Sequence, residues 1–284
     1  MDWLTANKLP IGRWIRDGVD LLDRYAGGVF DAIAFGLGSL IDAVTRSLLA
    51  LSPVATILIF AALVFWLHRS WRVPLLLVVS LLLIVNLGYW RETMETLALV
   101  SIATFFCMTI GVPVGIAAAH HPPLYTAIRP LLDLMQTIPT FVYLIPTLIL
   151  FGLGVVPGLI STIVFALPAP IRLTQLGISS VPLQLREAAD AFGASRWQKL
   201  LKVELPHALP AILAGLTQCI MLSLSMVVIA ALVGADGLGK PVVRALNTIN
   251  VAMGFEAGLS IVILAILLDR IVRVPRFARP GIGR

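Results

Sequence analysis

One polar stretch in an otherwise apolar chain indicates how the protein is organised: Glu187-Ala188-Ala189-Asp190-Ala191-Phe192-Gly193, continuing to Val203-Glu204-Leu205-Pro206. Apolar residues recur in its first half at helical spacing, and Gly193 is placed to end that helix in a left-handed conformation. A second helix is predicted to begin at Ser195, where Gln198 completes a capping box, and to stop at Pro206. A simple connecting loop does not need two capped helices, so the segment predicts a surface on which a separate soluble protein docks.

The composition assigns the chain to the membrane. Of its 284 residues 59% are hydrophobic and 13% are charged, whereas a soluble domain carries about 25% charged residues. Its mean hydropathy is +0.97, and the apolar residues gather in long runs. We therefore predict an all-α integral membrane protein, a polytopic bundle of about seven transmembrane helices. The predicted spans cover residues 52–67, 73–89, 94–118, 131–152, 155–177, 208–233 and 257–272.

Four regions follow from these spans. Residues 1–50 form an N-terminal amphipathic, non-spanning segment of one or two helices, because apolar residues recur there at helical spacing with aspartates between them. Residues 51–92 contain two transmembrane helices. Residues 93–273 form the core, with the cytoplasmic loop 180–207 inside it, and residues 274–284 form a basic tail. Glycines at 152–158 join the fourth and fifth spans into an antiparallel hairpin, and prolines inside the spans are expected to bend them.

Basic residues lie mainly on one side of the predicted spans, in the turns near 69–72 and 129, around the polar segment and in the tail. The positive-inside rule then places the polar segment and the C-terminus in the cytoplasm and the N-terminus outside. The net charge of +6 is explained by this topology, and we expect no nucleic-acid partner.

The spacing of the polar segment resembles the cytoplasmic signature loop of the permeases of ABC importers. The shared pattern is Glu-Ala-Ala, three residues, Gly, nine residues, a β-branched residue, any residue, then Leu-Pro; Val203 stands where the family more often has Ile. The resemblance implies that this loop docks on a separate ATPase. It assigns that role to Glu187, Ala188, Ala189, Asp190, Gly193, Leu205 and Pro206.

A narrower resemblance covers about residues 90–272. The runs at 135–146, 165–172, 224–230 and 237–239 are similar to those of permeases that import glycine betaine, proline betaine or choline. This family resemblance implies a type I ABC importer fold, a homodimer in the bacterial inner membrane, cytoplasmic ATPase subunits and an external substrate-binding protein. A low-affinity path needs small polar and soft side chains, for which we consider Thr140, Tyr143, Ser223, Ser225 and Met226.

Other functional classes fit the sequence less well. An ion-coupled secondary transporter of a small solute is the main alternative, but it would need carboxylates inside the membrane and two related halves, and neither is apparent. A membrane enzyme would need a catalytic cluster, and none assembles. The chain has no phosphate-binding loop, so ATP would be bound by the partner subunit. We expect no cofactor or metal of its own, and we interpret His120 and His121 as solvated loop residues.

Overall fold

The computed structural model describes residues 11–272, and within that range the chain contains helices and turns but no strand. This confirms the all-helical membrane fold. In chain order the helices are α2 (Ile11–Leu49), α3 (Pro53–His68), α4 (Arg72–Asn86), α5 (Trp90–His120), α6 (Pro122–Thr137), α7 (Thr140–Phe151), α8 (Val155–Ala166), α9 (Pro168–Ser179), α10 (Leu183–Ala191), α11 (Arg196–Lys199), the π-helical turn η1 (Leu200–Glu204), α12 (Leu205–Ala231), α13 (Gly239–Thr248) and α14 (Val251–Val272).

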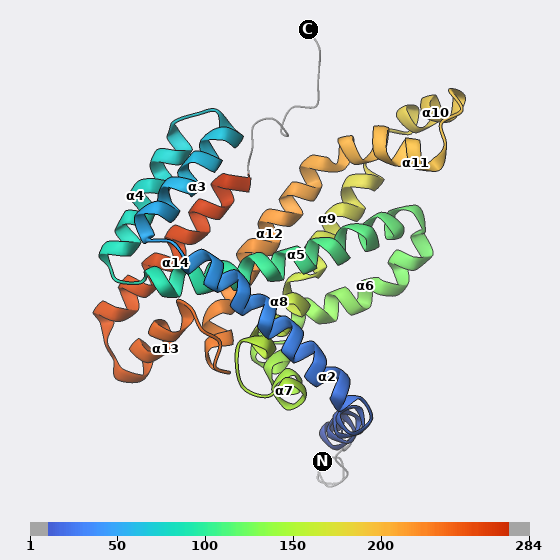
Figure 1. The fold of residues 1–284 in the computed structure, drawn as a ribbon. Helices are drawn as coiled ribbons and strands as arrows, with labels where there is room; N and C mark the ends of the chain where they lie inside the picture. Colours follow the sequence, from blue (N-terminus) through green and yellow to red (C-terminus); the bar gives the residue numbers. More distant parts are fainter. Residues whose placement is uncertain (1–10, 273–284) are drawn as a thin grey trace, which may run out of the picture.

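The centre of the bundle is built by α5, α9 and α12, which pack closely against one another (Figure 1). Small residues allow this approach, because a Cβ atom added to Gly115 would lie only 2.7 Å from the Ile171 carbonyl oxygen. Gly111 packs in the same way on the ring of Pro170. The contact between α5 and α9 therefore depends on missing side chains rather than on large interdigitating ones.

Five helical stretches are long and apolar enough to cross a membrane: Arg24–Leu49, Trp90–His120, Val155–Ser179, Arg196–Ala231 and Val251–Val272. The pair α6 and α7 would make a sixth, and α3 and α4 are shorter apolar helices. Each of the seven predicted spans thus corresponds to an apolar helix or to a pair of helices.

The span predicted over residues 131–152 is broken near Pro139, one of the prolines that were expected to bend the spans. The chain is helical there on both sides of a break, and α6 and α7 meet at an angle of 97°. Ile138 is extended at the break, as expected for a residue that precedes a proline. The Tyr143 hydroxyl donates a hydrogen bond of 2.6 Å to the Met135 carbonyl and so stabilises the bend. The predicted hairpin of the next turn is present, since α7 packs on α8.

A second group of helices, α3, α4 and α14, packs beside the central three around its own apolar cluster. The described part of the N-terminal segment is a single helix, α2, whose C-terminal half rests on α5, α7 and α8. Figure 1 shows it running obliquely across the bundle. Because Arg24–Leu49 is long and apolar enough to span, the non-spanning assignment of residues 1–50 stays a prediction. The basic tail at 274–284 lies outside the described residues.

Candidate functional site

The first helix of the polar segment is α10, and its end has the predicted geometry. Gly193 has a φ of 70°, in the left-handed region. The Ala194 N–H donates to the Ala189 carbonyl at 3.0 Å and the Gly193 N–H to that of Asp190 at 2.9 Å. These two bonds form a Schellman-type cap, in which glycine takes the left-handed conformation without a Cβ clash. The chain therefore reverses sharply after α10.

The second helix begins as predicted but does not stop as predicted. The Ser195 hydroxyl accepts a hydrogen bond from the Gln198 N–H, and the Gln198 side chain accepts one from the Ser195 N–H at 2.8 Å. The prediction that this helix stops at Pro206 is wrong, because α11 continues through η1 into α12. Pro206 lies in the first turn of α12, directly after the π-helical turn, where the missing N–H is tolerated.

We call α10, α11 and η1 together the platform. A salt bridge joins its two short helices: the Lys199 ammonium lies 2.7 and 2.9 Å from the two carboxylate oxygens of Asp190. Figure 1 shows the platform at the far tip of the bundle, beyond the ends of α5, α9 and α12. The platform is thus an ordered projection rather than a loop folded back onto the bundle.

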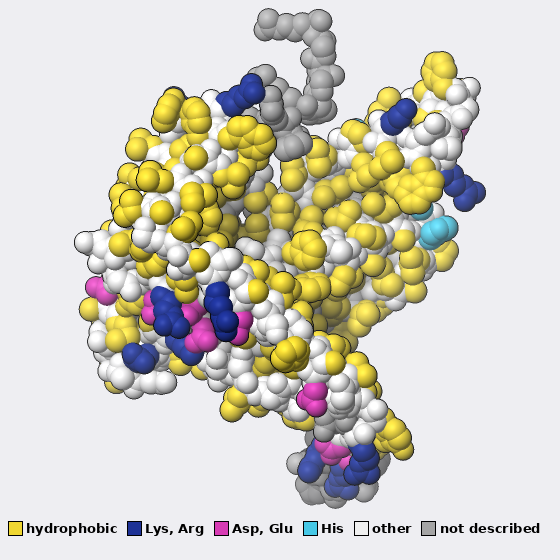
Figure 2. Space-filling view, viewed as in Figure 1, with side chains coloured by type: hydrophobic (Ala, Val, Ile, Leu, Met, Phe, Trp, Pro, Cys, Tyr) yellow, Lys and Arg dark blue, Asp and Glu magenta, His cyan; other side chains and the backbone are white. Residues whose placement is uncertain are grey.

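The platform presents an apolar surface outward. Phe192 is 92% exposed and Trp197 is 71% exposed, and Leu183 is also largely exposed. In Figure 2 hydrophobic side chains gather at this tip beside Lys or Arg side chains. Large exposed aromatic groups on an ordered projection are typical of a protein–protein contact.

The predicted docking residues divide between this surface and its support. Four are exposed: Glu187, Ala188, Asp190 and Gly193. Ala189 is buried against the platform itself, and Leu205 packs on the apolar cluster under it. Pro206 is exposed at the start of α12. The first four are therefore accessible on the platform, Ala189 and Leu205 are packed inside it or under it, and the docking role of all seven stays a prediction.

At the base of the platform, where it meets the end of α5, lies an ionic cluster that was not predicted from the sequence. The Glu204 carboxylate, 3% exposed, has one oxygen 2.7 Å from His120 Nε2 and the other 3.4 Å from Arg186 Nε. The interpretation of His120 as a solvated loop histidine is wrong, since it lies in the last turn of α5 and pairs with this carboxylate. A glutamate in the largely apolar run 200–205, which holds one other charged residue, Lys202, was the available signal, because a buried charge needs partners.

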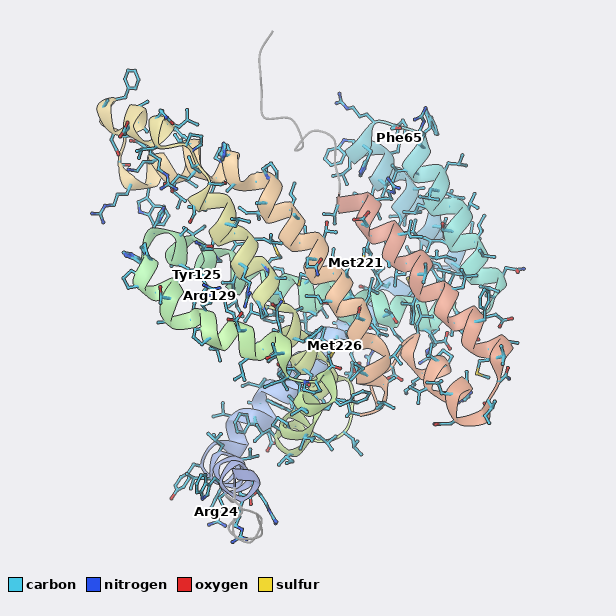
Figure 3. All side chains as sticks on the ribbon, turned by 180° about the vertical axis from the view of Figure 1, so that it is seen from behind. Arg24, Phe65, Tyr125, Arg129, Met221 and Met226 are labelled. Carbon is cyan, nitrogen blue, oxygen red and sulfur yellow. The ribbon has the colours of Figure 1, made fainter. Side chains whose placement is uncertain are left out.

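The candidate path residues do not converge on one place. Tyr143 is engaged at the α6–α7 bend, and Thr140 begins α7. Ser223 and Met226 are fully buried within the chain, and Met226 lies inside the bundle on α12 in Figure 3. Ser225 faces outward and donates a hydrogen bond of 3.0 Å to the Met221 carbonyl. Their role in a path stays a prediction.

The described residues contain no cluster of three or more His, Cys, Asp or Glu that could hold a metal ion. The platform is an exposed apolar surface on a short two-helix projection. Its exposed face carries aromatic groups, and its base is joined to the bundle by the continuous helix η1–α12 and by the ionic cluster.

Comparisons with known proteins place this arrangement among transport proteins. The family model described as "binding-protein-dependent transport system inner membrane component" matches residues 111–274. The glycine betaine transport system permease protein OpuAB of Bacillus subtilis is 44% identical over 266 residues, which cover 94% of this chain and 94% of that protein. The glycine betaine/proline betaine transport system permease protein ProW of Escherichia coli is 43% identical over 273 residues, covering 96% of this chain and 77% of that protein.

A solved structure supports the same assignment. A chain of the MetNI methionine ABC transporter, in an inward-facing conformation, matches with a TM-score of 0.59 and 28% identity. The match covers 65% of this chain and 94% of that chain.

Proposed function

This chain belongs to the family of binding-protein-dependent transport system inner membrane components and is the permease of an ABC importer; from this premise we propose that it imports a quaternary ammonium compound of the glycine betaine type. It forms the translocation path as a homodimer and is driven by a separate ATPase. The observation that carries the proposal is the platform, an ordered and exposed two-helix projection that includes the Glu187-Ala188-Ala189 signature.

The platform supports an ATPase as the docking partner. Phe192 and Trp197 project outward and stay largely exposed within residues 11–272, and the capped turn at Gly193 and the Lys199–Asp190 salt bridge hold the surface in one shape. A rigid docking surface joined to a membrane helix can transmit a displacement of its partner to that helix. ATP is then bound by the partner, and this chain needs no nucleotide site of its own.

Two further assignments belong to the proposal. The chain is a multi-pass protein of the bacterial inner membrane, with the platform and the C-terminus in the cytoplasm and the N-terminus outside, as the distribution of basic residues indicates. An external binding protein captures the solute and delivers it to the opposite face. The names of the similar permeases support glycine betaine, proline betaine and choline as the solutes to test first.

The proposal is tested by reconstitution. The permease, its ATPase and its binding protein are assembled in proteoliposomes, and uptake of radiolabelled glycine betaine and choline is measured with and without ATP. We expect saturable uptake that requires ATP and the binding protein. Uptake driven by a sodium or proton gradient without ATP would instead support a secondary transporter and overturn the proposal.

The quaternary ammonium class is tested in the same vesicles. Labelled methionine, which carries a primary rather than a quaternary amine, serves as the matched comparison. ATP-dependent uptake of methionine but not of glycine betaine or choline would retain the importer and refute the proposed solute class.

A further inference from the structure

Glu204 stands apart from every other charged residue that the structure describes. Among the side chains whose burial the structure describes, it is the one charged residue in the buried core, with 2% of its surface exposed. Burial of a carboxylate costs several kcal/mol unless partners compensate the charge. The partners that compensate its charge therefore show which helices are held together at the base of the platform.

The two oxygens of Glu204 contact two different helices. Oε2 lies 2.7 Å from His120 Nε2 at the end of α5, and Oε1 lies 3.4 Å from Arg186 Nε on α10. The Arg186 guanidinium also donates a hydrogen bond to the Ile178 carbonyl, near the end of α9. Four elements, α5, α9, α10 and η1, thus meet at one buried charge.

This junction matters because it links α10 to α5, which is not its neighbour in the chain. Helix α10 packs mainly on α11 and η1, both within the platform. The chain itself connects α10 to α9 through residues 180–182 and to α12 through α11 and η1. The polar link from α10 to α5 runs through Arg186, Glu204 and His120.

We propose that Glu204 is a positioning residue whose negative charge joins the docking helix α10 to the end of α5. When the ATPase displaces α10, the ion pair with Arg186 and the contact with His120 make α5 follow. This inference rests on the proposed function, because it presupposes that an ATPase moves the platform. The coupling between the helices depends on the negative charge of Glu204 rather than on the volume of its side chain.

Two substitutions separate charge from volume. Glu204→Gln keeps the size of the side chain but removes the charge, and it leaves the Arg186 guanidinium without a counterion. Glu204→Asp keeps the charge and loses one methylene group. Asp20→Asn is the matched control, since it converts another carboxylate to an amide in an exposed pair with Arg16, 3.7 Å away on α2.

The experiment uses the complete transporter in proteoliposomes and measures ATP hydrolysed per glycine betaine imported, normalised to assembled complex. We expect Glu204→Gln to raise this ratio at least about tenfold, the size of a lost buried charge contact. The ratio for Glu204→Asp should be closer to the parental ratio than the ratio for Glu204→Gln is, and the ratio for Asp20→Asn should equal the parental one. A role in folding alone would lower the amount of complex but leave the ratio unchanged.

The outcomes are separable. If Glu204→Gln assembles with the parental ratio, or if Glu204→Asp is more uncoupled than Glu204→Gln, the inference is refuted. If Glu204→Gln does not assemble, the ratio is measured for His120→Gln instead, because a side chain that is 38% exposed contributes less to folding than the buried Glu204 does. A raised ratio for this variant supports the inference, and an unchanged ratio overturns it. Failure of the parent to import glycine betaine with ATP would refute the proposed function instead.

Discussion

Replacement of Phe192 by alanine tests the docking surface most directly. A phenylalanine side chain can bury about 200 Å² on contact, and Phe192 is 92% exposed, so nearly all of that area is available to a partner. At about 25 cal/mol per Å² the upper limit is about 5 kcal/mol. Because association offsets part of such a gain, we expect the substitution to weaken ATPase binding by about 2 kcal/mol, or about 30-fold.

The measurement is a titration of purified permease in nanodiscs with the purified ATPase subunit, which yields a Kd. Phe255→Ala provides the control, since Phe255 is 71% exposed but lies on α14, close to α13 and far from the platform (Figure 1). The thermal stability of both variants should equal that of the parent, because neither side chain is buried in the chain.

Two results would refute this reasoning. If Phe192→Ala binds the ATPase within about threefold of the parent, then Phe192 lies outside the interface and the platform does not dock through its apolar face. If Phe255→Ala weakens binding as much as Phe192→Ala, then apolar area anywhere on the permease contributes, and the platform has no special role.

Three more substitutions test the local structure. Gly193→Val should cost about 1–2 kcal/mol of left-handed strain and reduce uptake per assembled transporter more than Gly193→Asn does; equal losses would contradict the role of the backbone angle. Ser195→Ala removes the capping box, worth about 1 kcal/mol, so hydrogen exchange should accelerate at residues 195–199; protection equal to the parent's would count against the cap. Gly115→Ala places a Cβ atom 2.7 Å from the Ile171 carbonyl oxygen and should lower the Tm by at least about 2 °C. Gly36→Ala, with no atom within 4 Å of the new Cβ, should leave the Tm unchanged or raise it.

Local features of the site could be predicted because neighbours in sequence determine them. The left-handed turn at Gly193 and the capping box at Ser195 depend on residues within about one helical turn. The same is true of the interruption near Pro139, since a proline restricts the residue before it. The size of the resulting bend could not be predicted, because it depends on how α7 packs on α8 and on the Tyr143–Met135 hydrogen bond.

The continuation of α11 into α12 shows where local rules fail. Pro206 is a sound stop signal for an isolated helix. In the folded chain, η1 widens the hydrogen bonding by one residue directly before the proline: the Leu205 N–H donates to the Leu200 carbonyl. The helix therefore continues through the position at which the sequence predicts its end.

By itself the sequence determined that this is a helical membrane protein with a capped polar platform, because hydrophobic runs, glycine angles and capping boxes act over a few residues. Only the tertiary structure decided how the base of the platform is held to the bundle. His120 and Glu204 are 84 residues apart, and nothing local to either residue specifies the other as its partner. Packing of α5 and α9 against α12 places the two side chains together, and burial then makes their contact strong.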